Sequence, residues 1–381
     1  MVTQVHARQA SPTEVKSGMR RAQGGTGADD AVFFQGDGER QSPETTIRLL
    51  ASYQATSGVT SDSYSLGGTV EELEHVMARY LGKESALFVP TGTLANHLAI
   101  RKHCGTRGQA LVPEQSHIYR DTGDSIARLS GIQLVPLAQD RPGPTAGEVR
   151  DALDRVATDR VPSPAGVVVL ESPVRRQMGR VIAYEDIQTI TTLCRERGVA
   201  THLDGARLFM MAAATGVSVQ AYSALFDTVY VSVCKYLGAP FGAILAGTRE
   251  FIDGLYHDRR MFGGSLPAAW MAAALVLQGL PGFEERFGAA MTRARHLFSA
   301  LNHLDGLRIS PLPDGSNIVP LRLDAGVRRV ALTQRLVEHG IVLPMEGGTD
   351  TEIPLTINTT ILRRNPDELL DAFAHALQGC G

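Results

Sequence analysis

Short apolar runs that alternate with helical segments constrain this chain most, because few folds accommodate that alternation. The runs predict buried strands at residues 85–89, 110–113, 132–136, 166–170, 200–203 and 228–233, with a further edge strand at 243–247. Helical spacing separates them, at residues 71–80, 94–102, 146–156 and 185–197. This order predicts an α/β fold in which helices cover both faces of a mainly parallel sheet. Ligands of such sheets bind outside the carboxyl ends of the strands.

Beyond Pro267 the pattern changes to long helical stretches followed by a β-rich portion. The helical stretches cover 268–277 and 283–304, the strands lie near Ile309, 318–323 and 355–357, and a last helix covers 366–377. We therefore expect a smaller α+β domain at residues 286–381, attached to a larger domain at residues 31–285. Residues 1–30 are rich in Gln, Ser, Gly, Thr and Arg and predict a mobile N-terminal tail.

Composition excludes several classes of protein. The 381 residues are 43% hydrophobic, and the formal net charge of −3 with a pI of about 6.4 provides no field that favours nucleic acid or an anionic membrane. No stretch approaches the roughly 20 apolar residues that cross a bilayer. The four cysteines are scattered without a CxxC pair, which favours a reducing, cytoplasmic setting and disfavours a zinc or disulfide framework. We expect no metal.

Two charged residues each follow a predicted strand. Asp204 lies in the segment THLDGAR at 201–207, and Lys235 lies in VSVCKYLGAP at 231–240. Parallel strands end at the same rim of a sheet, so both side chains should meet there. A lysine can form a Schiff base with an aldehyde, and a nearby aspartate can keep a pyridine nitrogen protonated, which together describe a pyridoxal phosphate (PLP) site. Taken singly, Asp204 fits a cap equally well and Lys235 fits a solvated surface.

The segment PTGTLAN at residues 90–96 supports the cofactor interpretation. It follows the strand at 85–89 and opens a helix, where the small residues Gly92 and Thr93 leave backbone N–H groups exposed. A phosphate is favoured at such a helix N-terminus by those donors and by the macrodipole. The alternative is an ordinary strand-to-helix turn with a threonine cap. The order of phosphate turn, aspartate and lysine favours the cofactor.

These three motifs resemble those of the threonine aldolase and β-eliminating lyase family, which belongs to the fold-type I PLP-dependent enzymes. The resemblance runs from about Phe33 to the C-terminus. It implies the fold-type I architecture, PLP as the cofactor and an enzyme that acts on an amino acid. A dinucleotide-binding fold is excluded, because no GxGxxG follows a strand.

The resemblance also implies roles for individual residues. Lys235 would carry the cofactor and then act as a base or acid, and Asp204 would pair with the ring nitrogen. His117 would lie flat on the ring and relay protons, where the alternative is a histidine that caps the next helix. Arg207 would face the cofactor and the substrate carboxylate, where the alternative is a surface arginine.

Three further residues are implied at a subunit interface. Tyr64 lies in a loop that approaches the neighbouring subunit's site in the family, and Arg259 and Arg260 resemble a segment that reaches the neighbour's phosphate. Ordinary surface loops are the alternative for all three. Because family sites are built from two subunits, we expect a homodimer or a homotetramer with shared active sites.

The substrate side departs from the family at three places. Val174 stands where the family has a histidine that acts on the substrate's β-hydroxyl, and valine cannot accept a proton. Thr356 aligns best with the family's carboxylate-binding arginine, and residues 35–38 replace an Arg-Ser-Asp-Thr stretch. Arg175 or Arg176, in the altered loop, would supply the missing positive charge.

The sequence leaves three functions open. The first is a PLP-dependent lyase that acts by threonine-aldolase-like Cα–Cβ cleavage or by β-elimination, for which proton removal from Cα by Lys235 suffices. The second is a specialised biosynthetic PLP enzyme, performing transaldolation, replacement or decarboxylation on a modified amino acid. The changes at Val174 and Thr356 favour it. The third is a non-enzymatic descendant, against which the intact Lys235 and Asp204 argue.

Overall fold

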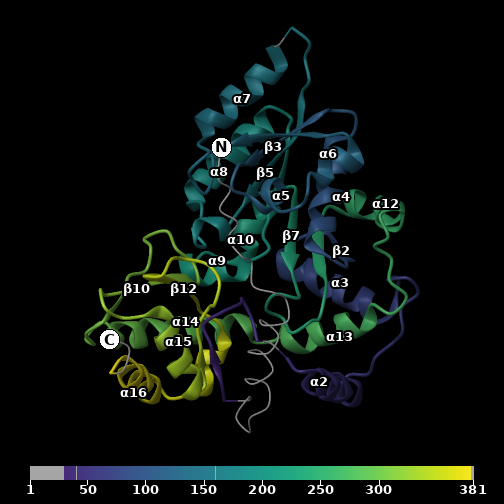
Figure 1. Cartoon of the computed structure of the whole chain (residues 1–381). Helices are drawn as coiled ribbons and strands as arrows, with labels where there is room; N and C mark the ends of the chain where they lie inside the picture. Colours follow the sequence, from purple (N-terminus) through teal and green to yellow (C-terminus); the bar gives the residue numbers. More distant parts are fainter. Residues whose placement is uncertain (1–29, 40, 159, 379–381) are drawn as a thin grey trace, which may run out of the picture.

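The computed structural model describes residues 30–39, 41–158 and 160–378. The tail expected at 1–30 lies outside the described residues, apart from Asp30. The rest forms an α/β region in the upper part of Figure 1 and a smaller α+β region at its lower left, and one apolar core runs through both.

A seven-stranded sheet forms the centre of the larger region, in the order β2-β8-β7-β6-β5-β3-β4. Every strand predicted for this region is present. The strands are β2 (Ser85–Val89), β3 (Gln109–Pro113), β4 (Gln133–Leu137), β5 (Ala165–Glu171), β6 (Ala200–Asp204), β7 (Thr228–Ser232) and β8 (Ala243–Gly247). β3 to β7 run parallel to one another, which confirms the mainly parallel sheet.

The prediction that Ala243–Gly247 forms an edge strand is wrong. β8 lies between β2 and β7, runs antiparallel to both, and all five of its residues are buried. The ten residues between β7 and β8 turn the chain back on itself, so β8 pairs beside β7. β2, and not β8, therefore forms this edge of the sheet.

Helices cover both faces of this sheet, as predicted. The apolar side chains of α4 (Gly92–Cys104) pack on the face that carries Val167 and Val169 of β5. The alternate residues Val168 and Leu170 face the opposite layer, to which α3 (Gly68–Leu81) and α8 (Tyr184–Glu196) contribute. The remaining helices of this region are α5 (His117–Arg120), α6 (Ser125–Ser130), α7 (Ala146–Thr158), α9 (Leu208–Thr215), α10 (Val219–Ala224), α11 (Arg249–Asp253) and α12 (Tyr256–Met261).

The smaller region is built on a three-stranded antiparallel sheet in the order β12-β10-β9. Its last helix covers the predicted range. The elements are α14 (Phe283–Leu301), β9 (Leu307–Ile309), β10 (Ile318–Leu323), α15 (Arg329–Glu338), β11 (Ile341–Val342), β12 (Glu352–Thr356), the 3₁₀ helix η2 (Thr359–Arg363) and α16 (Pro366–Leu377). The preceding helix, α13 (Trp270–Gly279), packs on α3 of the larger region. A boundary between residues 285 and 286 falls inside α14 and stays a prediction.

The start of the described chain also packs on this smaller region. β1 (Val32–Phe33) pairs in parallel with β11, and the Asn358 amide donates hydrogen bonds to the carbonyls of Phe33 and Gly36, at 2.9 and 3.0 Å. The following residues are thereby held where the two regions meet. α2 (Pro43–Thr56) begins at the Ser42 cap and lies apart at the lower edge of Figure 1, next to α13.

Among the described helices, none is both long and apolar enough to span a membrane.

Candidate active site

Three titratable side chains meet where the central strands end. Glu171 ends β5 and is paired in register with Asp204, which ends β6. Lys235 follows β7 by three residues. Burial and the nearby Arg207 lower the pKa of Lys235, while the carboxylates of Asp204 and Glu171 act in the opposite direction. Lys235 and Asp204 are therefore neighbours at one rim of the sheet, as their positions after parallel strands predict.

Asp204 is buried, and both of its carboxylate oxygens accept hydrogen bonds. It is only 3% exposed. One carboxylate oxygen accepts a hydrogen bond from the Asn96 amide at 2.6 Å, and the other accepts one from the backbone N–H of Ala206 at 3.1 Å. The alternative role, in which Asp204 caps a surface turn, does not fit this burial.

Arg207 forms a buried ion pair with Asp37. Its Nε atom lies 3.0 Å from both carboxylate oxygens, and its Nη2 atom lies 2.9 Å from one of them. The side chain of Arg207 is 7% exposed and that of Asp37 is 11% exposed, so the surface alternative for Arg207 is wrong. Sequence reasoning missed Asp37 as a site residue. Its position within the 35–38 stretch, opposite an aspartate of the family pattern, was the available signal.

The N-terminus of α4 lies at the end of β2. Thr91 caps the helix, because its side chain accepts a hydrogen bond from the backbone N–H of Leu94 at 3.1 Å. A Cβ atom added at Gly92 would lie 1.8 Å from the hydroxyl of Tyr230, so only glycine fits there. Gly92 and Thr93 thus occupy the first positions of a thirteen-residue helix, as predicted. Their contact with a phosphate stays a prediction.

His117 is joined to the rim by Glu171. The backbone N–H of His117 donates a 2.6 Å hydrogen bond to the Glu171 carboxyl group. Burial, and after it the charge of Asp204, raises the pKa of Glu171 to about 8. Sequence reasoning missed Glu171. The only signal was a carboxylate at the buried end of a strand, and that signal is weak without its neighbours.

On the substrate side, Arg175 and Arg176 lie at the surface, whereas the adjacent Val174 does not. Val174 is fully buried, and its backbone N–H donates to the Arg180 carbonyl at 2.9 Å. Arg176 forms an ion pair with Asp121, with Nε and Oδ2 3.0 Å apart. Arg175 is exposed and begins the short 3₁₀ helix η1 (Arg175–Gln177), to which Arg176 also belongs. Of the two arginines proposed to replace the missing charge, Arg176 is already paired.

Thr356 lies beside the segment that carries Asp37. It ends β12 and is half-buried, and its backbone N–H donates to the Phe34 carbonyl at 2.8 Å. The position that aligns with the family's carboxylate-binding arginine is therefore next to the site, with a short neutral side chain.

Tyr64 lies in a tight, exposed loop. Its φ is 54°, its side chain is 50% exposed, and the Arg260 guanidinium lies 5.2 Å from the centre of its ring. Arg259 differs, because it is fully buried and donates to the carbonyls of Phe88 and Ser65 at 2.9 and 3.2 Å. The prediction that Arg259 reaches a neighbouring subunit is therefore wrong. The Arg259 side chain instead binds the loop around Ser65 in its own chain, and of the two arginines only Arg260 is exposed.

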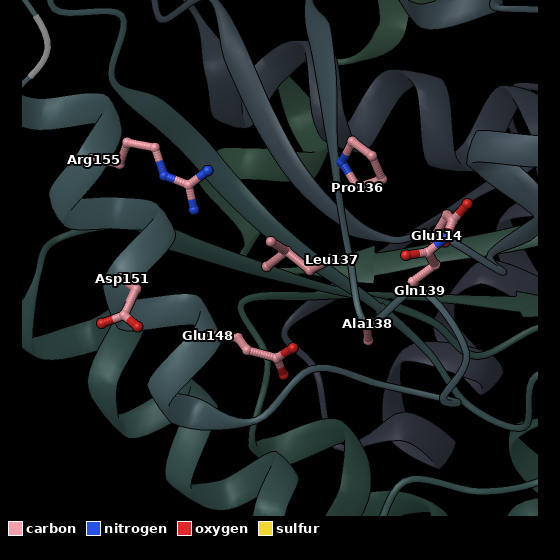
Figure 2. A pocket seen from close by; sticks show the side chains of 8 residues that line it. All are labelled: Glu114, Pro136, Leu137, Ala138, Gln139, Glu148, Asp151 and Arg155. Atoms are coloured by element: carbon pink, nitrogen blue, oxygen red, sulfur yellow. The ribbon is translucent and has the colours of Figure 1, made fainter.

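A pocket of about 460 Å³ lies elsewhere, beside β4 and α7 (Figure 2). Of its charged side chains, Glu148, Asp151 and Arg155 come from α7, and Glu114 follows β3. Glu148 is already paired with Arg141, at 2.5 Å. None of the predicted site residues lines this pocket, so it is separate from the Lys235 rim.

The chain is similar in sequence to a known family and to several of its members. The family described as Beta-eliminating lyase matches residues 45–323. Low-specificity L-threonine aldolase 1 of Arabidopsis thaliana is 28% identical over 323 residues, which cover 84% of this chain and 90% of that protein. The low specificity L-threonine aldolase of Escherichia coli K12 is 30% identical over 235 residues, 61% of this chain and 69% of that protein.

A solved structure from Exiguobacterium sp. 255-15 extends the comparison to the fold. That protein was assigned to the aromatic amino acid β-eliminating lyases and threonine aldolases. It superposes with a TM-score of 0.77 at 24% identity and covers 93% of this chain and 98% of its own.

Fold and family together define the class: a fold-type I enzyme of the PLP-dependent kind, with its aspartate at the end of β6 and its lysine three residues beyond the adjacent parallel strand β7. Within that class, the chain belongs to the Beta-eliminating lyase family, which includes the threonine aldolases. Both the family and the fold class expected from the sequence are confirmed.

Proposed function

We propose that this protein binds PLP through Lys235 and cleaves the Cα–Cβ bond of a small β-hydroxy-α-amino acid, as a threonine aldolase does. The observation that carries the proposal is the meeting of Lys235, Asp204 and the N-terminus of α4 at one rim, in a chain of this family.

The chemistry of the residues at the rim fits the cofactor. Lys235 offers an amine to the aldehyde, Asp204 an anionic acceptor for the ring nitrogen, and Gly92 and Thr93 the backbone donors for the phosphate. His117 would cover one face of the ring. When bound, PLP supplies an electron sink that stabilises negative charge at the substrate's Cα.

Two side chains are suited to handle the substrate itself. The lowered pKa of Lys235 increases the fraction of its amine that is unprotonated and so able to accept a proton. Arg207 uses Nε and Nη2 for Asp37, which leaves Nη1 to bind the substrate carboxylate. The buried ion pair thus aims the guanidinium and neutralises part of its charge.

Cleavage requires a group that takes the proton of the β-hydroxyl. Val174 cannot do so, and we assign this role to His117, whose backbone N–H is bound by Glu171 at the rim. As the hydroxyl proton passes to His117, Cβ becomes the carbon of an aldehyde and the bonding electron pair stays with Cα. Cα then gains one proton, which equals the one taken up by His117 and is delivered by His117 or by the amine of Lys235. The fragment that carries Cα leaves as glycine, so that atoms and charge balance.

A second function is favoured by the substrate side. Val174 and Thr356 lack the groups that the family uses on the β-hydroxyl and the carboxylate. β-Elimination, or a specialised reaction on a modified amino acid, would need neither of these groups in their family positions. Such a reaction is the alternative that experiment should separate from cleavage.

Product analysis separates these reactions. The PLP-loaded protein is supplied with L-threonine and L-allo-threonine, and acetaldehyde and glycine are measured. It is also supplied with β-chloroalanine, and pyruvate is measured. Acetaldehyde supports the aldolase proposal, and pyruvate alone supports the elimination. If protein that holds PLP forms neither acetaldehyde nor pyruvate, the aldolase proposal and the elimination are both overturned. The Lys235→Ala variant controls for cofactor in solution.

We also propose a homodimer or homotetramer with shared sites. The exposed apolar side chains of Tyr64, Leu66, Met261 and Met271 support an interface near the α12 loop and α13. Light scattering on the purified protein would test it, and a monomer at micromolar concentration would contradict it.

A further inference from the structure

A chain of buried hydrogen bonds leads away from Asp204 between α4 and the sheet. The Asn96 amide nitrogen lies 2.6 Å from Asp204, and its oxygen lies 2.9 Å from Nε2 of His202. Nδ1 of His202 lies 2.9 Å from the hydroxyl of Thr228, which lies 2.8 Å from Nε2 of His103. Asn96, His202 and Thr228 are each at most 1% exposed.

The elements that carry these residues explain why they meet. His202 and Thr228 are register partners on β6 and β7. Asn96 and His103 are seven residues apart on α4, and two helical turns bring both to the same face of the helix. The helix therefore contacts the sheet at two points along one hydrogen-bond path. His103 ends the path, stacked on Phe251 with ring centres 4.4 Å apart.

Donor and acceptor chemistry gives this path a single direction. An ionised carboxylate only accepts, so the Asn96 amide nitrogen donates to Asp204 and the Asn96 oxygen must accept from Nε2–H of His202. A neutral His202 then accepts at Nδ1 from the Thr228 hydroxyl, which in turn accepts from Nε2–H of His103. Every donor therefore points toward Asp204.

Both histidines are in the neutral form that this direction requires. Burial lowers the pKa of His202 to about 3 and that of His103 to about 4. A second proton on His202 would turn Nδ1 into a donor, and the Thr228 hydroxyl would have to reverse. The path therefore has one consistent arrangement at neutral pH.

We infer that Asn96, His202, Thr228 and His103 are positioning residues, which hold Asp204 as an oriented anion facing the cofactor's ring nitrogen. Aligned hydrogen bonds polarise one another, so each distant donor strengthens the one that reaches Asp204. The inference rests on the proposed PLP function and deepens it, because it names the groups that prepare Asp204 for its partner.

The variant pair Thr228→Val and Thr228→Ser tests this inference. Valine replaces the hydroxyl with a methyl group of similar size, whereas serine keeps the hydroxyl, and Thr228 is two residues along the path from Asp204. We expect Thr228→Val to weaken PLP binding by a few-fold to tenfold and to shift the visible absorbance of the bound cofactor. Thr228→Ser should stay within about twofold of the original protein.

A second measurement needs no cofactor. Nitrogen NMR of the histidine-labelled protein without PLP should show His202 neutral, with its proton on Nε2 and a hydrogen-bonded Nδ1. The Nδ1 signal should move in Thr228→Val and not in Thr228→Ser. The His202→Gln variant assigns the signal. It should also retain PLP binding, because an amide can donate to Asn96 and accept from Thr228.

The outcomes separate this inference from the proposed function. Two results would overturn the path. One is a His202 proton on Nδ1, and the other is a folded Thr228→Val variant that binds PLP with unchanged affinity and spectrum. If Thr228→Val does not fold, His202→Gln and His202→Leu provide the same contrast, and equal PLP affinity of the two would overturn it. If the original protein does not bind PLP, the proposed function and the role of the path are both overturned. The NMR measurement, which needs no PLP, would still show whether the hydrogen bonds of the path run in the inferred direction.

Discussion

The half of the site that we propose for the cofactor (the cofactor half) and the half that we propose for the substrate (the substrate half) are built differently. In the cofactor half, Asp204 is 3% exposed with two hydrogen bonds, and Arg207 is 6% exposed in a bidentate ion pair. In the substrate half, the side chain of Arg176 is 46% exposed in its pair with Asp121, and Arg175 lies exposed beside it. One half is fixed by the core and the other is carried by a surface turn.

This difference indicates which part of the enzyme can change. A buried charge that loses its partner destabilises the fold, so the residues around Asp204 and Arg207 depend on one another. A surface turn tolerates substitution, because its side chains are solvated and make few contacts. Substitutions at exposed positions of that turn, such as Arg175, can therefore alter substrate choice while the cofactor half stays intact.

The largest effect should come from the residue on which the cofactor half depends. Replacing Lys235 with alanine should abolish the borohydride-stable PLP adduct and lower turnover about a thousandfold, as expected for loss of a positioned base. Mass spectrometry of the reduced protein measures the adduct. The neighbouring Cys234, which is exposed, provides the control Cys234→Ala. An adduct on another lysine would contradict the prediction.

The next largest effect should separate buried from exposed ion pairs. Asp37→Ala leaves the buried Arg207 charge unpaired and should lower the free energy of unfolding by about 3–5 kcal/mol. Asp314→Ala breaks the pair with Arg180, in which both side chains are 36% exposed, and should lower it by about 1 kcal/mol or less. Urea unfolding of both variants measures the contrast. Equal losses would contradict it.

A smaller effect should depend on pH. Because the pKa of Glu171 is about 8 in the folded protein against an ordinary value of 4.5, the unfolded chain loses this proton first as pH rises. The buried carboxyl group therefore reduces stability progressively between these two values. Glu171→Gln removes this penalty. Its advantage should grow across the window to roughly 1–3 kcal/mol and then level off.

Thermal unfolding at a series of pH values, without cofactor, measures the Glu171 effect. The exposed Glu285→Gln controls for loss of one negative charge. A pH-independent difference for Glu171→Gln would contradict burial as the cause.

The smallest effect should distinguish the two substrate-side arginines. Arg175→Ala should raise KM about threefold to tenfold, because we expect its guanidinium to supply a second positive charge to the substrate beside that of Arg207. Arg176→Ala should change KM little, since its guanidinium is paired with Asp121. PLP affinity, measured by fluorescence, should be unchanged in both. A larger KM effect at Arg176 would reverse the assignment.

Local sequence patterns were sufficient to predict the strands of the sheet, its helices and the central charged pair. Strand and helix periodicity depend on neighbouring residues, so the predicted strands and the last helix, α16, are found where expected. Asp204 and Lys235 were predictable as neighbours because parallel strands end at one rim. The motifs around them also identified the family correctly.

The residues that surround that pair could be identified only from the folded chain. Asp37 is 170 positions from Arg207, and Glu171 is 54 positions from His117. Local patterns carry no information about contacts at such separations. The interior position of β8 and the burial of Arg259 escaped prediction for the same reason. Burial, ion pairing and hydrogen-bond direction depend on which segments pack together, and this is known only once the whole chain is folded.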